Sequence, residues 1–145
     1  MKAIADEIAA TQPLLVGLQE AALWRTGPVF QPDPATVVQA DFVQMLLAAL
    51  AERGLPYAAL AVVSGSDAEV PTSLGIDVRL TLQDAILART DLKTADLKLS
   101  NLQTGYYKNY LSYPTVMGTI AFPRQWASVD VKIRGKEFRF VTTHL

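Results

Sequence analysis

The stretch FRFVTTHL at residues 138–145 alternates apolar and polar side chains and then places His144, the single histidine of the chain, directly after them. The stretch VDVKI at residues 129–133 shows the same alternation, which is typical of β-strands with one buried face. Arg134 and Gly135 stand between the two stretches and suit a tight turn. The sequence therefore predicts an antiparallel hairpin that carries His144 at the end of its second strand.

Upstream of this hairpin, helical and extended patterns alternate. The strand–helix–strand order of the first part of the chain predicts a parallel crossover. Helices are expected over residues 2–10 and 35–53, and strands over residues 14–19, 57–63, 74–80, 84–89 and 97–100. Loops are expected over residues 27–34 and 64–72, and a mixture of strand and loop over residues 91–123. These patterns favour an α/β (α+β) fold with a mixed sheet and flanking helices.

The composition indicates one domain without cysteine chemistry. The chain has 145 residues and 50% hydrophobic residues, yet no apolar run approaches the roughly 18 residues of a membrane helix. A formal net charge of -1 provides no basic field for nucleic acid, and the lack of cysteine excludes disulfides and a cysteine nucleophile. Asp6 and Glu7 stand where a signal peptide would be apolar, so none is visible. A removed leader or an upstream segment stays open, and the localisation is unknown.

Glu20 follows the buried strand predicted over residues 14–19. A carboxylate at the carboxyl end of such a strand faces the crevice where open α/β sheets bind ligands. Magnesium is held by one or two carboxylates together with phosphate and water. Glu20 is therefore a candidate metal ligand, and the alternative is an acidic residue that begins a solvated loop.

His144 is the candidate for acid–base or phosphate chemistry. A protonated imidazole can donate to a phosphate oxygen, and a neutral one can accept a proton from water. The alternative is a histidine at the surface or the edge of the core. Arg25, Arg124 and Trp126 are candidates for a substrate groove, with packing at a loop–strand junction as the alternative.

Four short motifs follow one another along the chain: VGLQE at 16–20, AILAR at 85–89, ASVDV at 127–131 and FRFVTTHL at 138–145. Their order and spacing resemble the first half of the endonuclease/exonuclease/phosphatase superfamily, also called deoxyribonuclease-I-like. The family fold is a four-layer α/β/β/α sandwich. The opening strand with its T-x-N asparagine, the GDFN segment and the SDH segment have no counterpart. The resemblance therefore implies a partial domain over residues 1–145 that lacks the first strand and the C-terminal half.

The resemblance also implies roles for three residues. Glu20 would bind a divalent metal ion, Mg²⁺ with Mn²⁺ or Ca²⁺ as alternatives, and His144 would contact the scissile phosphate. Asp84 would orient His144, although an aspartate that begins a strand beside a turn is an equal alternative. Thr142 occupies a position where the family often has asparagine, and a hydroxyl cannot supply both hydrogen-bonding functions of a carboxamide.

The function expected from this resemblance is that of a fragment of a Mg²⁺-dependent hydrolase. Its substrate would be a phosphodiester or phosphomonoester, such as a nucleic acid, a phospholipid head group or a small molecule. The chain by itself is expected to be inactive or nearly so. One alternative is a non-catalytic interaction module that pairs through an exposed sheet face, with self-association as its signature. Another is a carrier of a small apolar ligand, suggested by the hydrophobic composition alone.

Overall fold

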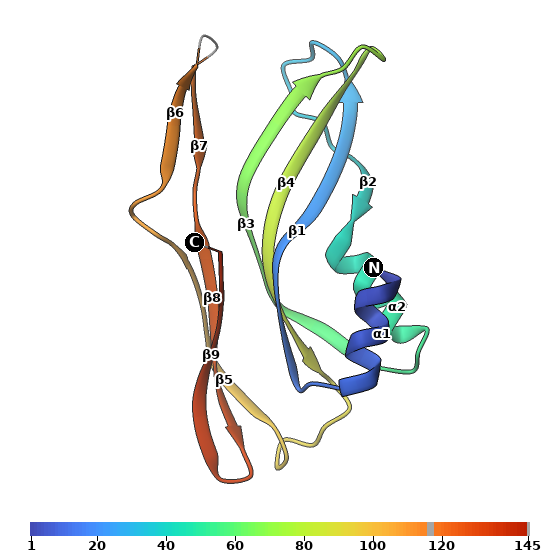
Figure 1. The fold of residues 1–145 in the computed structure, drawn as a ribbon, viewed down its shortest axis with the longest axis vertical. Helices are drawn as coiled ribbons and strands as arrows, with labels where there is room; N and C mark the ends of the chain where they lie inside the picture. The colour runs from blue at the N-terminus through green and yellow to red at the C-terminus, as the bar shows by residue number, and fades with distance from the viewer. Residues whose placement is uncertain (116–117, 145) are drawn as a thin grey trace.

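The computed structural model describes residues 1–115 and 118–144 and consists mainly of antiparallel sheets, with helices α1 (Lys2–Thr11) and α2 (Phe42–Ala51) packed on one of them (Figure 1). The α+β class predicted from the sequence is confirmed. No helix in this described part of the chain is long and apolar enough to cross a membrane. The strands are β1 (Leu15–Pro28), β2 (Val37–Asp41), β3 (Tyr57–Pro71), β4 (Ile76–Arg89), β5 (Lys98–Tyr106), β6 (Leu111–Thr115), β7 (Gly118–Phe122), β8 (Gln125–Ile133) and β9 (Lys136–Thr143).

The strands form a four-stranded sheet of order β2-β1-β4-β3, a three-stranded sheet of order β5-β8-β9 and the β6–β7 pair. In the four-stranded sheet, β1 and β3 run in the same direction, but β4 lies between them and is antiparallel to both. The crossover expected from the sequence thus joins parallel strands that are not neighbours. The predicted hairpin is confirmed as β8 and β9, and the turn residues Arg134 and Gly135 both have positive φ.

One predicted loop, two predicted strands and one predicted helix differ in the structure. The polar residues 64–72 continue β3 to Pro71, and the two strands expected over 74–80 and 84–89 form the single strand β4. The helix expected over 35–53 begins only at Phe42, because β2 precedes it and the Asp41 side chain accepts a hydrogen bond from Gln44 N–H at 3.0 Å as its N-cap. Apolar periodicity could not locate this start, since the β2 residues before it are also partly apolar.

The core has two parts, one on each face of the four-stranded sheet. Ala85 and Leu87 of β4 pack with buried residues of α1 and α2. Ile86, between them in sequence, packs on the opposite face with Val129 and Val131 of β8. This alternation on one strand holds the helices, the four-stranded sheet and the three-stranded sheet in three successive layers (Figure 1).

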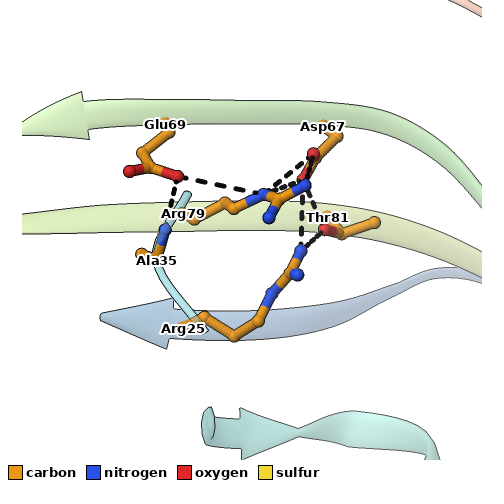
Figure 2. Close-up of polar contacts among 6 residues, drawn as sticks. All are labelled: Arg25, Ala35, Asp67, Glu69, Arg79 and Thr81. Atoms are coloured by element: carbon orange, nitrogen blue, oxygen red, sulfur yellow. Dashed lines mark hydrogen bonds and ion pairs between the residues drawn. The ribbon is translucent and has the colours of Figure 1, made fainter. Parts of the chain in front are cut away.

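Strands β1, β3 and β4 extend beyond α2 (Figure 1). An ion cluster joins these three strands (Figure 2). The Asp67 carboxylate accepts hydrogen bonds from Arg25 Nη2 at 3.2 Å and from Arg79 Nε at 2.9 Å. The Thr81 hydroxyl also donates to it. Burial raises the pKa of the Asp67 carboxyl, but hydrogen bonds from Arg79 and Thr81 and the charges of both arginines outweigh it and lower the pKa. Cross-strand ion pairing therefore explains why so polar a sequence extends β3 and β4.

We expect Asp67→Asn to lower the free energy of unfolding by about 1–2 kcal/mol at pH 7, because two partly exposed guanidinium groups lose their shared counter-charge. A lowered pKa in the folded state means that ionised Asp67 stabilises the fold above the ordinary aspartate pKa of about 3.9. This contribution is lost as the pH falls through the lower folded-state pKa. Urea unfolding at several pH values measures the difference, which should shrink below about pH 4.

The control for this prediction is Asp33→Asn, the same charge change at an exposed residue of the loop between β1 and β2. Equal unfolding free energies for the two variants at neutral pH would show that the cluster contributes nothing to stability.

Candidate active site

Glu20 lies at a bulge in the middle of β1. The register of β1 against β4 shifts between Leu18 and Ala21, and Glu20 adopts a left-handed conformation with φ of 52°. The sequence placed Glu20 at the carboxyl end of a strand, and this is wrong, because β1 continues to Pro28. A bulge frees a residue from the regular ladder and redirects its side chain, so Glu20 still projects as an exposed carboxylate.

His144 follows the last residue of β9, as the sequence predicted. Its Nε2 atom lies 3.6 Å from Oε1 of Glu20, and the two side chains are 30% and 55% exposed. Residues separated by more than a hundred positions thus meet at one accessible point, where β1 of one sheet passes β9 of the other. The expectation that they share a site agrees with this geometry. Leu145, the last residue of the THL motif, lies outside the described residues.

Asp84 is fully buried in the middle of β4. Its Oδ1 atom accepts a hydrogen bond from Glu20 N–H at 3.3 Å. Burial raises the pKa of Asp84, while the Glu20 N–H group, the nearby His144 and the Gln125 side chain lower it. Asp84 does not begin a strand, because it lies inside β4. Its carboxylate fixes the backbone of the bulge by accepting the hydrogen bond from Glu20 N–H. Its expected action on His144 stays a prediction.

Thr142 joins the two strands that carry Glu20 and His144. Its buried hydroxyl accepts a hydrogen bond from Gln19 Nε2 at 2.6 Å and donates to Leu18 O at 3.4 Å. A Cβ atom at Gly17 would lie 3.1 Å from Thr142 Oγ1, so glycine allows β1 and β9 to approach here. Sequence reasoning missed Gln19 as a structural residue, although it stands directly beside Glu20.

We expect Gly17→Val to lower the free energy of unfolding by about 1–3 kcal/mol, because its branched side chain would push Thr142 and Phe140 away from β1. Thermal unfolding followed by circular dichroism measures this loss. The matched control is Ala68→Val, which adds the same kind of side chain at an exposed position of β3. A Gly17→Val protein as stable as this control would contradict the close approach of the two strands.

Arg124 contacts the ring of His144 from the side opposite to Glu20, with Nη1 3.1 Å from Nδ1. Arg124 was one of several groove candidates, and the structure brings it to the site. Arg25 instead belongs to the ion cluster around Asp67. Trp126 packs its indole ring so closely against Gly105 that a Cβ atom there would lie 2.7 Å from it.

The donors at this point fit one part of a magnesium site. Mg²⁺ takes few protein carboxylates and fills its shell with water and phosphate oxygens. Glu20 supplies one exposed carboxylate, whereas the Asp84 carboxylate is buried and accepts from a backbone amide. Across the described residues there is no group of three or more His, Cys, Asp or Glu that could hold a metal ion. Among these residues, the Glu20 carboxylate is therefore the one suited to bind Mg²⁺ directly.

Comparisons with known proteins connect this geometry with one fold. No family model matches the sequence, and no curated protein matches it. A solved structure described as "endonuclease/exonuclease/phosphatase family protein from Leptotrichia buccalis C-1013-b" is similar over 99% of this chain, with a TM-score of 0.54 and 16% sequence identity. The present chain covers 46% of that protein, so it spans about half of its length. The chain therefore has the fold of part of an endonuclease/exonuclease/phosphatase domain.

Proposed function

We propose that this chain forms part of the active site of a metal-dependent phosphoesterase, which hydrolyses a phosphodiester or phosphomonoester bond. The observation that carries the proposal is the 3.6 Å approach of Glu20 and His144, which an endonuclease/exonuclease/phosphatase-like fold brings together from two sheets. A carboxylate beside an imidazole in an exposed position suits a phosphate group accompanied by a cation.

In this proposal, each residue acts according to its exposure. Glu20 would hold a divalent cation, Mg²⁺ with Mn²⁺ or Ca²⁺ as alternatives, which supplies charge stabilisation of the phosphate when bound. His144 lies beside that carboxylate and would contact a phosphate oxygen. Asp84 would keep Glu20 in place through the backbone N–H of the bulge. A buried support beneath an exposed ligand is the arrangement that keeps metal ligands in a productive orientation.

The substrate class follows from phosphate chemistry and from net charge. A formal charge of -1 gives the chain no general attraction for polyanions. A phospholipid head group or a small phosphoester is therefore as suitable a substrate as nucleic acid. The site residues would recognise the phosphate itself, and the remainder of the substrate would be selected elsewhere.

A metal titration tests the proposal. A generic phosphodiester is offered to a catalytically competent protein that contains this chain, first with a chelator and then with increasing Mg²⁺. Hydrolysis should be absent with the chelator and should rise with the cation. Hydrolysis that is unaffected by the chelator would contradict a metal-dependent site.

A second candidate function, an interaction module, is favoured by exposed apolar side chains. Five large apolar residues on strands β6, β7 and β9 are each about half exposed to solvent: Leu111, Tyr113, Ile120, Phe138 and Val141. Val141 shares the outer face of β8 and β9 with ion pairs between Lys132 and Glu137 and between Asp130 and Arg139, so this face is mixed in character. Pairing would therefore use the apolar positions and the free edge of β9.

We expect the chain to self-associate or to bind a hydrophobic dye, because exposed apolar surface beyond a few hundred Å² usually marks an interface. Light scattering and dye fluorescence measure the two effects. Phe138→Ser should weaken both, whereas Lys136→Ser on the same strand should leave them unchanged. A monodisperse monomer that does not increase the fluorescence of the dye would contradict the interaction-module function.

A further inference from the structure

The contact between Arg124 and His144 determines which ring nitrogen carries a proton. Arg124 Nη1 lies 3.1 Å from His144 Nδ1, a distance suitable for a hydrogen bond. A guanidinium group contains only donors, so the partner nitrogen has to accept. An imidazole nitrogen accepts only through a free lone pair, and the proton of the neutral ring must then reside on Nε2.

The backbone holds these two side chains beside each other. Strands β8 and β9 pair Trp126 with Thr143 at the end of their ladder. Gln125 and His144 are the next residues of the two segments, and Arg124, one residue before Gln125, reaches His144 diagonally through its side chain. The Thr143 hydroxyl donates to Gln125 O at 3.0 Å, and Arg124 O accepts from Tyr107 N–H at 2.9 Å. Both chain segments at the contact are therefore fixed by hydrogen bonds of their own. This arrangement limits the freedom of Arg124 to leave the histidine ring.

We propose that Arg124 is a positioning residue that selects the tautomer of His144, so that the neutral ring carries its proton on Nε2. That N–H group lies on the side of the ring where Glu20 Oε1 is 3.6 Å away. Resting on the proposed phosphoesterase function, the inference assigns His144 the role of a hydrogen-bond donor to a phosphate oxygen. A neutral ring with a protonated Nε2 cannot take a proton from water at that atom, so the general-base role is excluded there.

The single histidine of the chain makes a direct test practical. Nitrogen-15 NMR of ring-labelled protein reports one imidazole, and its two nitrogens differ in shift according to which carries the proton. The spectrum is recorded in alkaline solution, where imidazoles are neutral. In the wild type, Nδ1 should give the unprotonated signal and Nε2 the protonated one. Arg124→Met should bring the two signals together, as expected for a mixture of tautomers.

Two further variants separate positioning from general damage. Arg124→Lys keeps a donor and should retain the wild-type asymmetry of the two signals. Lys108→Met removes a positive charge from the exposed segment that follows Tyr107 and should also leave the signals unchanged. A wild-type Nδ1 that carries the proton, or an Arg124→Met spectrum identical to the wild type, would overturn the inference. No substrate is present in this experiment, so its outcome is independent of whether the protein hydrolyses phosphoesters.

Discussion

Glu20→Gln should reduce phosphoester turnover by on the order of 10³-fold in a catalytically competent protein that contains this chain. A neutral carboxamide removes the charge that attracts the cation, while the size of the side chain is kept. The backbone N–H of residue 20 can still donate to Asp84, so the bulge should persist. The loss should therefore come from weaker metal binding.

Turnover measured over a range of Mg²⁺ concentrations checks this expectation. The concentration for half-maximal activity should rise in Glu20→Gln, and saturating metal should restore part of the rate. Glu7→Gln is the control, because it makes the same change at an exposed position of α1. Metal dependence identical to that of the wild type would show that Glu20 is not a ligand.

His144→Ala should reduce turnover by roughly 10²–10⁴-fold, the range found when a positioned acid–base group or a hydrogen-bond donor to the transition state is removed. The imidazole lies beside the Glu20 carboxylate and is held from its other side by Arg124. Alanine removes the phosphate contact and leaves Arg124 without its acceptor. The loss should appear in kcat at saturating metal.

Metal dependence separates the two variants. The Mg²⁺ concentration for half-maximal activity should stay near the wild-type value in His144→Ala, because the histidine is not proposed as a ligand. Lys136→Ala, at an exposed position of the same strand β9, should have a much smaller effect on kcat. A His144→Ala protein with normal kcat would remove the histidine from the proposed mechanism.

Glu20 and Asp84 show that solvent exposure decides which acid of this site can bind a cation. Glu20 has to reach a cation in solvent, so its carboxylate is exposed. Asp84 cannot do so, because it is fully buried and one of its oxygens is occupied by the Glu20 N–H group. Both acids lie near His144. Their different burial in the folded protein makes Glu20 the candidate metal ligand and Asp84 the residue that fixes the Glu20 backbone.

Local patterns in the sequence were sufficient for the elements whose geometry depends on near neighbours. The β8–β9 hairpin follows from its alternation and from Arg134 and Gly135, and α1 follows from its apolar spacing. The position of His144 after a strand was predicted in the same way. The family motifs also indicated the fold and the meeting of Glu20 with His144, because motif order reflects a shared architecture.

Tertiary structure alone decided the features that depend on distant partners. The bulge at Glu20 arises where β1 changes register against β4, and polar residues extend β3 because Asp67 meets Arg25 and Arg79 across three strands. The Arg124 contact with His144 depends in turn on the pairing of β8 with β9. None of these has a local signature, since a hydrogen bond or ion pair between strands is set by register, and register is settled only when whole sheets pack.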